Sequence, residues 1–408
     1  MKYRLDCPIK TLRGKICLPT SKSISNRLLI IQALTSNEFD IAGLSDSDDT
    51  HVLQEGLRSA SELVDVGHAG TSMRFLTAYF AATGQAKTIT GSGRMKNRPI
   101  SDLVDALNQL GAGITYIEKE GCPPVRTSGN PLSGNTISIN GNISSQFITA
   151  LLLIAPTLPE GLTINITGRL VSASYVGMTL ELMRQAGVET VRKDNTITVT
   201  GQYNRSDTIT VECDWSAASY WYEMASLFDE VELLLEGATA ESLQGDAVAS
   251  QIARAWGIST EYIPEGALLT RHKKTCHLLE FDFINAPDII QTLAVTSCLN
   301  NTPFRFTGTE TLRVKETDRI AALQNELLKL GFVVKEPEKG VLEWDGERTN
   351  TQSDICISTY QDHRMAMSFA PVAVAFPDVL IDAPEVVSKS YPGFWKDLKN
   401  IGFNVRPA

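Results

Sequence analysis

The sequence has few of the residues that build metal sites, disulfide frameworks and membrane spans. Its 408 residues include only five histidines, and no spacing among them resembles a metal site. The seven cysteines are scattered and form no Cys-x-x-Cys pair, which is typical of reduced thiols in a cytosolic protein. The longest apolar runs, near 150–156 and 365–376, are too short to span a bilayer, and residues 1–6 carry no apolar signal core. We therefore expect a cytoplasmic protein with no bound metal and no membrane contact.

An excess of positive charge is also missing. The chain has 47 acidic residues against 37 basic ones, for a net charge of -10, and its basic motifs are not interleaved with aromatic residues. Both features disfavour nucleic-acid binding and general binding to a membrane surface. The basic residues gather instead in a few short motifs, which suggests a compact pocket for small anions. A non-catalytic protein that binds a polyanion is one interpretation of this pattern.

No Pro/Ser-rich linker divides the chain, yet its length favours two domains of about 200 residues. A helical stretch that ends at glycine and continues into a strand recurs at 107–114, 182–188, 253–258, 327–334 and 398–403, with a weaker copy at 52–60. Glycine after a helix relieves the left-handed strain at that position, so each copy marks a helix end before a strand. We predict an α/β chain of two similar domains, each of three repeated β/α units. The first domain covers 21–213, the second covers 1–20 plus 214–408, and the crossings lie near 20 and 214.

The residues from 19 to 27 predict a loop that opens a helix. Ser21 is suited to cap that helix, and Lys22 and Ser23 fall in its first turn. Arg27 lies four residues after Ser23, so the two share a helix face. Free backbone N–H groups and the positive end of the helix dipole add to these side chains. The stretch therefore predicts a binding site for a small polyanion, although an ordinary capped surface helix has the same local pattern.

Similar polar or charged helix starts recur along the chain, at 67–74, 91–99, 143–147, 172–175, 287–289, 312–319, 362–367 and 388–392. One such start is more often a simple cap or a solvated charge pair. The set predicts that these helix starts converge on one cleft between the two domains, lined by Lys22, Arg27, Arg94, Lys315, Arg319, Arg364 and Lys389. Asp288 and Glu316 are carboxylates among these cations, which suits general acid and base chemistry.

Six of these motifs, in order, resemble the 5-enolpyruvylshikimate-3-phosphate synthase family, also called 3-phosphoshikimate 1-carboxyvinyltransferase. They are 21–27, 69–74, 94–99, 144–146, 313–319 and 362–367, and they span nearly the whole chain. The resemblance implies the enolpyruvyl transferase fold with the active site in the interdomain cleft. It also implies transfer of the enolpyruvyl group of phosphoenolpyruvate to the 5-hydroxyl of shikimate 3-phosphate, with release of phosphate, in the pathway to aromatic amino acids. No metal or organic cofactor, a monomeric state and inhibition by glyphosate belong to the same expectation.

The resemblance assigns roles residue by residue. Asp288 would accept the proton of the 5-hydroxyl, and Glu316 with Lys22 would handle the proton at the methylene carbon. Shikimate 3-phosphate would be held by Lys22, Ser23, Arg27, Ser144, Ser145, Gln146, Ser172, Tyr175, Asp288 and Lys315. Phosphoenolpyruvate would be held by Lys22, Gly70, Arg94, Gln146, Arg319, Arg364 and Lys389.

The chain departs from the family pattern at three places. His68 stands where asparagine is frequent, and Ala173 stands where lysine is common. The segment 49–67 is short, so we expect the first repeat to lack a helix–strand portion. A rival with the same architecture is the enolpyruvyl transferase that acts on UDP-N-acetylglucosamine. It would carry a reactive cysteine on a glycine-rich loop, whereas this chain has Ser92 at the candidate position.

Overall fold

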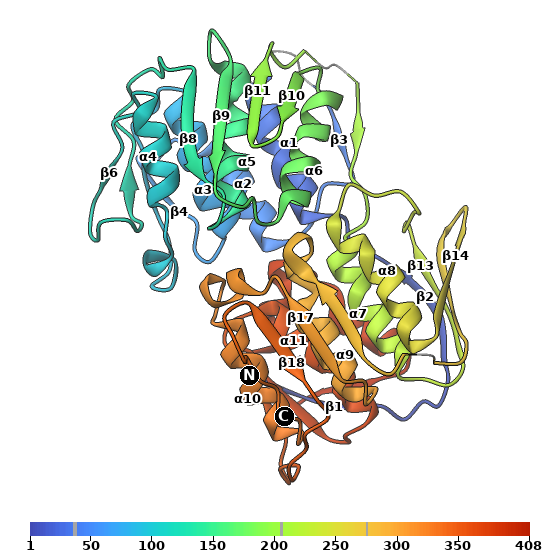
Figure 1. The fold of residues 1–408 in the computed structure, drawn as a ribbon. Helices are drawn as coiled ribbons and strands as arrows, with labels where there is room; N and C mark the ends of the chain where they lie inside the picture. The colour runs from blue at the N-terminus through green and yellow to red at the C-terminus, as the bar shows by residue number, and fades with distance from the viewer. Residues whose placement is uncertain (36–38, 205–206, 275) are drawn as a thin grey trace. The chain divides into compact units, whose positions relative to one another are not determined.

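The computed structural model describes residues 1–35, 39–204, 207–274 and 276–408, and Figure 1 shows its fold. The chain forms two compact units. We call Thr20–Val211 the inserted unit, and Met1–Pro19 together with Glu212–Ala408 the split unit. These limits differ by one residue from the crossing predicted near 20, and by two residues from the crossing predicted near 214.

Within its described residues the inserted unit contains six α-helices and three sheets. The helices are α1 (Lys22–Leu34), α2 (Asp48–Arg58), α3 (Gly70–Ala82), α4 (Ser101–Gln109), α5 (Ser145–Ile154) and α6 (Ala173–Gln185). The strands are β3 (Ile41–Ala42), β4 (Leu63–Asp65), β5 (Thr88–Thr90), β6 (Thr115–Tyr116), β7 (Val125–Arg126), β8 (Thr136–Asn140), β9 (Leu162–Thr167), β10 (Glu189–Lys193), β11 (Thr196–Thr200) and β12 (Ile209–Thr210). The sheet orders are β10-β11-β9-β8, β4-β5-β7-β6 and β12-β3.

The split unit likewise contains six α-helices and three sheets in its described residues. The helices are α7 (Trp215–Ser226), α8 (Ala249–Ile252), α9 (Ile290–Leu299), α10 (Arg319–Lys329), α11 (His363–Phe369) and α12 (Phe394–Asn400). The strands are β1 (Lys2–Asp6), β2 (Leu12–Cys17), β13 (Val231–Glu236), β14 (Ile258–Ile263), β15 (Gly266–Arg271), β16 (Leu279–Asp282), β17 (Phe304–Thr307), β18 (Val341–Trp344), β19 (Cys356–Ile357), β20 (Val379–Asp382) and β21 (Asn404–Pro407). The sheet orders are β19-β20-β1-β21, β14-β15-β13-β2 and β16-β17-β18.

Each sheet contains one parallel strand pair, and this is the repeated feature of the fold. Parallel neighbours need a crossover connection, usually through a helix. In the inserted unit, α3 joins β4 to β5 and α5 joins β8 to β9. In the split unit, α9 joins β16 to β17 and α11 joins β19 to β20. The remaining parallel pairs are β3 with β12 and β2 with β13. The predicted α/β fold of repeated β/α units is therefore confirmed.

The glycines of the five stronger copies of the repeat have left-handed backbone angles, whereas Gly56 of the weaker copy at 52–60 lies inside α2. Gly111, Gly187, Gly257, Gly331 and Gly402 have φ between 80° and 105°. At Gly257 an added Cβ would lie 2.3 Å from the carbonyl oxygen of His272, so both the angle and the space require glycine. The stretch before it differs in one respect from the prediction. Helix α8 ends at Ile252, and a 3-10 turn over Ala253–Trp256 completes the approach to the glycine.

The expectation that segment 49–67 lacks a helix–strand portion is wrong. Helix α2 fills most of this segment, and β4 follows and pairs in parallel with β5. The connection is compact because two serine side chains accept hydrogen bonds from the backbone. Ser59 accepts from the Ser61 N–H at 3.2 Å, and Ser61 accepts from the Leu63 N–H at 3.2 Å. A short segment therefore still completes the repeat.

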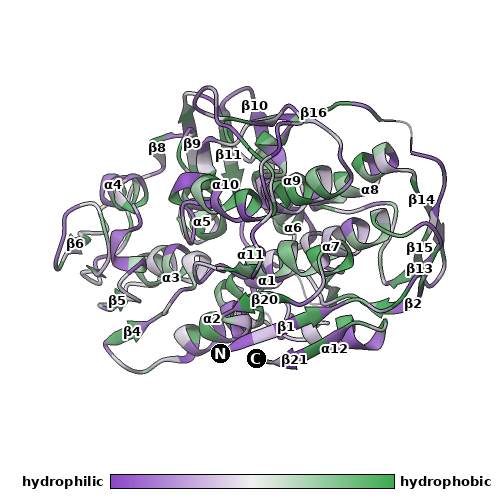
Figure 2. Cartoon of the chain, turned by 90° about the horizontal axis from the view of Figure 1, so that it is seen from below, coloured by the Kyte–Doolittle hydropathy of each residue, from purple (hydrophilic) through white to green (hydrophobic). Residues whose placement is uncertain are grey.

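The core of the split unit is rich in aromatic residues. Trp215, Trp221 and Trp256 are almost fully buried, and hydrophobic residues colour much of helix α9 in Figure 2. All five tryptophans of the chain, at 215, 221, 256, 344 and 395, belong to this unit. Tryptophan fluorescence therefore reports on the split unit alone. Among the described residues, the helices are all too short or too polar to cross a membrane.

Glu223, on the buried side of α7, is an exception within this core. Its side chain is 1% exposed, and neither carboxylate oxygen has a hydrogen-bond partner among the residues that the structure describes. Burial raises the pKa of Glu223 well above its ordinary value of 4.5. The folded protein therefore keeps a proton on Glu223 at pH values where the unfolded chain has lost it.

We expect Glu223→Gln to be increasingly more stable than the wild type as the pH rises above about 4.5. Over that range the folded wild type holds the Glu223 proton that the unfolded chain has lost, so the contribution of Glu223 to stability falls by up to about 1.4 kcal/mol per pH unit, whereas glutamine has no proton to lose. Urea unfolding followed by tryptophan fluorescence at pH 5, 6 and 7 measures this difference. Glu232→Gln, at an exposed position of β13, controls for the lost charge. Equal pH slopes for the wild type and Glu223→Gln would contradict the prediction.

Candidate active site

The predicted cap of α1 is present, and the lysine behind it contacts an acidic partner. Ser21 accepts a hydrogen bond from the Ile24 N–H at 3.4 Å. Lys22 Nζ lies 3.0 Å from Oδ2 of Asp49, and both side chains are largely buried. Asp49 lies in the first turn of α2. Asp49 was not predicted as a site residue, and only its place at a second polar helix start could have indicated it.

Buried polar contacts hold the start of α2 against α1. The Thr50 hydroxyl donates to Asn26 Oδ1 at 2.9 Å, and the Ser45 N–H donates to Ser25 Oγ at 3.0 Å. The side chains of these four residues are buried. Because hydrogen-bonded buried polar groups are costly to separate, these contacts hold the start of α2, which carries Asp49, close to α1, which carries Lys22.

Arg27 lies on the same helix face as Ser23, as predicted, and it also donates hydrogen bonds to α6. Its guanidinium donates to the Ser23 carbonyl at 2.7 Å, to Thr179 Oγ1 at 2.8 Å and to the Tyr175 carbonyl at 3.3 Å. The side chain is 3% exposed, and burial lowers its pKa to about 10. The Tyr175 ring lies beside it, with its centroid 5.7 Å from Arg27 Cζ. The structure thus brings three predicted residues, Ser23, Arg27 and Tyr175, to one place.

Helices α5 and α6 begin at the other predicted serines. Ser144 caps α5 by accepting from the Gln146 N–H at 3.3 Å, and the Gln146 amide donates to Thr71 Oγ1 at 3.4 Å. This second contact links the start of α5 to the start of α3, while Ser145 is buried in the first turn of α5. Ser172 precedes α6 with a φ of 55°, a conformation that serine seldom adopts, and its side chain does not cap the helix.

Gly70 opens α3 beside two arginines. An added Cβ at Gly70 would lie 2.5 Å from Nη1 of Arg98. Arg74 donates to the Gly70 carbonyl at 3.1 Å and to the Pro99 carbonyl at 2.9 Å. Arg94, a predicted phosphoenolpyruvate ligand, is exposed just before the short turn Met95–Asn97. A side chain at position 70 therefore requires the neighbouring guanidinium to move.

His68, one of the departures from the family pattern, has a defined neighbour. Its Nδ1 lies 3.0 Å from the Ser92 hydroxyl, and Ser92 is the residue between the two loop glycines. The two exchange a hydrogen bond whose direction depends on the histidine tautomer. The glycine-rich loop thus carries a hydroxyl paired with an imidazole at the position where a rival enzyme would carry a thiol.

Seven ionisable residues of the split unit form one charge cluster. Its members are Asp288, Lys315, Glu316, Arg319, Asp362, Arg364 and Lys389, and all except Asp362 were predicted as site residues. Arg319, the first residue of α10, lies at its centre. It contacts Asp362 at 2.8 Å, Glu316 at 2.9 Å and Asp288 at 3.3 Å. Burial acts to lower the pKa of Arg319, but the three carboxylates outweigh burial and raise it.

The two carboxylates predicted to be catalytic have further cationic partners. Asp288 contacts Arg364 at 2.9 Å and Lys315 at 3.7 Å, and Glu316 contacts Lys389 at 3.0 Å. Asp362 is fully buried and also caps α11 through the Arg364 N–H, so it anchors the cluster to that helix. With three carboxylates and four cations, the charge cluster has an excess of one positive charge, which suits an anionic ligand.

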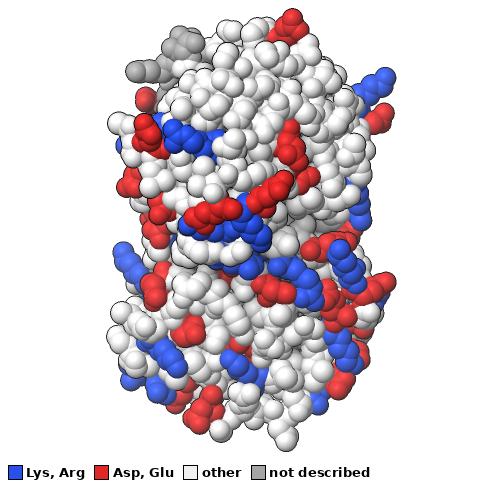
Figure 3. Space-filling model, turned by 90° about the vertical axis from the view of Figure 1, so that its left-hand side faces the viewer, with Lys and Arg blue, Asp and Glu red and all other residues white. Residues whose placement is uncertain are grey.

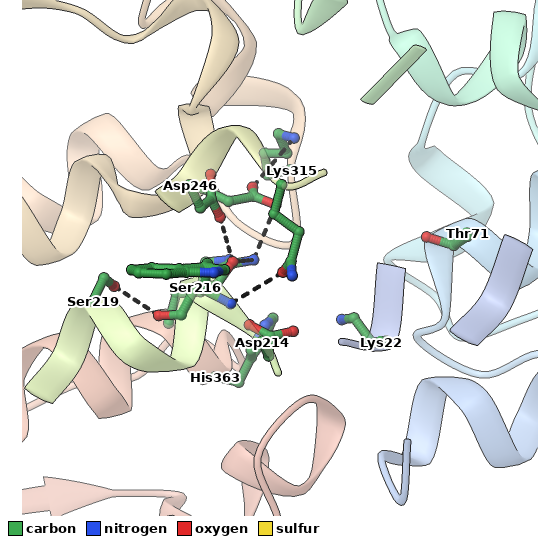
Figure 4. Close-up of polar contacts among 12 residues, drawn as sticks. Lys22, Thr71, Asp214, Ser216, Ser219, Asp246, Lys315 and His363 are labelled. Atoms are coloured by element: carbon green, nitrogen blue, oxygen red, sulfur yellow. Dashed lines mark hydrogen bonds and ion pairs between the residues drawn. The ribbon is translucent and has the colours of Figure 1, made fainter. Parts of the chain in front are cut away.

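Ser216 contacts the charge cluster, and Asp246 contacts Ser216; neither was predicted as a site residue. Ser216, in the first turn of α7, accepts a hydrogen bond from Arg364 at 3.3 Å, and it donates one to the buried Asp246. Figure 4 shows Asp246 directed at Ser216. Asp214 caps α7, because its Oδ1 accepts a hydrogen bond from the Ala217 N–H at 2.8 Å. Nothing in the sequence near Asp246 signals its position.

The predicted residues thus fall into two groups, one in each unit. Those in the split unit belong to the charge cluster. Those in the inserted unit are Lys22, Ser23, Arg27, Gly70, Arg94, Ser144, Ser145, Gln146, Ser172 and Tyr175. Within the described ranges, the His, Cys, Asp and Glu side chains form no group of three or more that could hold a metal. On the face that Figure 3 shows, acidic and basic side chains are interspersed, and no extended basic area is visible.

Comparison with known proteins identifies the family. A family model described as EPSP synthase (3-phosphoshikimate 1-carboxyvinyltransferase) matches residues 7–63 and 57–398. The 3-phosphoshikimate 1-carboxyvinyltransferase of Bacteroides fragilis (strain YCH46) is 46% identical over 407 residues, which cover 100% of this chain and 99% of that protein.

Solved structures share the fold at lower identity. An EPSP synthase from Acinetobacter baumannii aligns with a TM-score of 0.77 at 20% identity over 100% of both chains. The enolpyruvyl transferase NikO from Streptomyces tendae aligns with a TM-score of 0.74 at 16% identity and covers 99% of this chain and 98% of that one. The structural likenesses establish the fold, and the sequence matches establish the family. The chain belongs to the EPSP synthase (3-phosphoshikimate 1-carboxyvinyltransferase) family.

Proposed function

We propose that this protein transfers the carboxyvinyl group of phosphoenolpyruvate to the 5-hydroxyl of shikimate 3-phosphate and releases phosphate. Membership of the family supports this reaction. The observation that carries the assignment of residues is the charge cluster, where Asp288 and Glu316 contact four cationic side chains. The monomeric state and the cytoplasmic location remain predictions from the sequence.

In this proposal both units contribute binding residues. Lys22, Ser23 and Arg27 at the start of α1 bind shikimate 3-phosphate together with Ser144, Ser145, Gln146, Ser172 and Tyr175 of the inserted unit. Asp288 and Lys315 of the split unit complete that set. Phosphoenolpyruvate binds to Lys22, Gly70, Arg94, Gln146, Arg319, Arg364 and Lys389. Arginine suits this task because its planar fork pairs with both oxygens of a carboxylate or phosphate, while lysine acts as a point charge.

The chemistry proceeds by addition and elimination. Asp288 accepts the proton of the 5-hydroxyl while the oxygen bonds to the enol carbon, and Glu316 with Lys22 delivers a proton to the methylene carbon. The tetrahedral intermediate then loses phosphate as the methyl group returns a proton and the double bond reforms. Three cationic side chains fix the direction of the Asp288 carboxylate. Alignment of the reactants can account for about 7–11 kcal/mol of barrier lowering, and one acid–base group for about 10²–10⁴ in rate.

Phosphate release tests the proposal. The protein is given phosphoenolpyruvate with shikimate 3-phosphate in one reaction and with UDP-N-acetylglucosamine in another. We expect release only in the first. Release with the nucleotide sugar would assign the rival reaction, which the family match and Ser92 at the loop position both disfavour. Binding of both substrates without release would favour a non-catalytic polyanion-binding protein.

We expect glyphosate to inhibit the reaction in competition with phosphoenolpyruvate, and Gly70→Ala to weaken this inhibition. The physical reason is space, because an added Cβ would lie 2.5 Å from Nη1 of Arg98 and would displace that guanidinium. The measurement is the glyphosate inhibition constant at several phosphoenolpyruvate concentrations. Gly177→Ala is the control, because a Cβ at position 177 has no heavy atom within 4 Å. Wild-type activity that is unaffected by millimolar glyphosate would contradict the prediction.

A further inference from the structure

Asp246 is a buried carboxylate outside the set of residues assigned above. It lies in the short 3-10 turn Gly245–Val248, and its side chain is 4% exposed. Its Oδ2 accepts a hydrogen bond from the Ser216 hydroxyl. Its Oδ1 is buried and has no hydrogen-bond partner in the described part of the chain. Loss of the Ser216 hydroxyl would leave this buried carboxylate without its hydrogen bond, which is energetically costly.

The same hydroxyl leads into the charge cluster. Ser216 Oγ accepts a hydrogen bond from Arg364 Nη2 at 3.3 Å, and this Nη2 contacts Asp288 Oδ2 at 2.9 Å. A guanidinium Nη carries two hydrogens, so the same Nη2 can donate to both Ser216 and Asp288, and each contact restricts the direction of the Arg364 fork. We call the series Asp246, Ser216 and Arg364 the serine relay, and Figure 4 shows its first contact.

The relay is sensitive to the charge on Asp246. The charged groups that act on Asp246 are Asp288, Arg364 and Asp214, and the Ser216 hydroxyl contacts it directly. Burial, followed by the charge of Asp288, raises the pKa of Asp246 to about 7, against the opposing effects of Arg364 and Ser216. An ionised Asp246 forms a stronger, charge-assisted hydrogen bond with the Ser216 hydroxyl than a protonated one does. That bond turns the hydroxyl proton toward Asp246 and leaves the oxygen lone pairs for Arg364.

We propose that Asp246 is a positioning residue for phosphoenolpyruvate, and that it acts through Ser216 to hold the Arg364 guanidinium in its binding orientation. This inference rests on the proposed function, which assigns Arg364 to phosphoenolpyruvate. Asp246 itself touches neither the substrate nor the reacting atoms in this proposal. Its removal therefore weakens phosphoenolpyruvate binding without changing the binding of shikimate 3-phosphate.

The test is the KM for phosphoenolpyruvate of the wild type and of Asp246→Asn at pH 6 and pH 8. Asparagine resembles the protonated acid, so the ratio of the two KM values should be close to one at pH 6. At pH 8, where the wild-type carboxylate is ionised, we expect the variant KM to be about fivefold to tenfold higher. The comparison at each pH cancels the titration of the substrate itself. A ratio that is the same at both pH values would overturn the relay.

Two more variants separate the relay from general damage. Ser216→Ala breaks the relay at any pH, so it should raise this KM at both pH values, and adding Asp246→Asn should raise it no further. Glu223→Gln is the matched control, because Glu223 is a buried carboxylate on the same helix as Ser216 and its ratio should stay near one. Calorimetry should give an unchanged dissociation constant for shikimate 3-phosphate. Equal weakening of both substrates would overturn the proposal.

The remaining arms distinguish failure of the relay from failure of the proposed function. Arg364→Lys should raise the phosphoenolpyruvate KM, and an unchanged value would refute the assigned role of Arg364 and the relay with it. A raised KM in Arg364→Lys with a pH-independent ratio in Asp246→Asn would refute the relay alone. Tryptophan fluorescence verifies that each variant folds. If Asp246→Asn does not fold, Ser216→Ala decides, since an unchanged KM in that variant refutes the relay.

Discussion

Asp288→Asn is expected to lower the turnover number by about 10²–10⁴ while leaving the affinity for shikimate 3-phosphate within a few fold. Asparagine has nearly the same shape, and its carbonyl oxygen still accepts hydrogen bonds from the surrounding cations. It cannot take up the proton of the 5-hydroxyl. The three cations around this position, Lys315, Arg319 and Arg364, keep their charge, so an anionic substrate loses no attraction. Because Asp288→Asn removes a negative charge from among these cations, any small change in the affinity for shikimate 3-phosphate should be toward tighter binding.

Two measurements are needed for this prediction. Phosphate release at saturating substrates gives the turnover number, and calorimetry gives the dissociation constant of shikimate 3-phosphate. Asp318→Asn is the control, because Asp318 caps α10 at the edge of the same motif and asparagine is an equally good cap. We expect that control to keep both parameters. Lost shikimate 3-phosphate binding with unchanged turnover would show that Asp288 is a binding residue and that the base lies elsewhere.

The parts of the site that the sequence predicted correctly are those set by local chemistry. Ser21 caps α1, and Asp362 caps the helix start predicted at 362–367, because a short acceptor side chain at a helix start satisfies a free backbone N–H. Gly331 ends α10 because glycine tolerates the left-handed angle there. Each of these features depends on residues within a few positions of one another. A single sequence contains that information in full.

The parts that the sequence did not predict depend on contacts between distant segments. Lys22 and Asp49 are 27 positions apart, and Ser216 and Asp246 are 30 positions apart. Which two polar residues meet is determined by how the helices pack, and no local pattern records it. The wrong expectation for the repeat at 49–67 has a related reason. The length of this segment does not reveal the serine-stabilised turn that lets α2 and β4 fit into few residues.

Arg319 illustrates both cases. The sequence predicted a cation that binds an anionic substrate, and the structure adds three carboxylates from three separate segments around it. Its side chain is 1% exposed, so the guanidinium is part of the core of the split unit as well as a proposed ligand. Substitution of a residue with both roles should therefore have a large effect on stability.

Arg319→Met is expected to destabilise the split unit by about 3–5 kcal/mol at pH 7. Methionine fills a similar volume but leaves Asp288, Glu316 and Asp362 without their shared partner, and Asp362 is fully buried. Arg319→Lys should lose less, because it keeps the charge, yet an ammonium cannot match all three carboxylates as the planar guanidinium does. Urea unfolding followed by tryptophan fluorescence measures both variants, since every tryptophan lies in this unit.

The matched control is Arg313→Met, which removes an arginine from the same motif. Arg313 contacts Asp318 and Glu336, but its side chain is 41% exposed, so its loss should cost at most about 1 kcal/mol. If Arg319→Met cost no more than Arg313→Met at pH 7, the other cations, Lys315, Arg364 and Lys389, would suffice to neutralise the three carboxylates. Arg319 would then be free to serve the substrate alone.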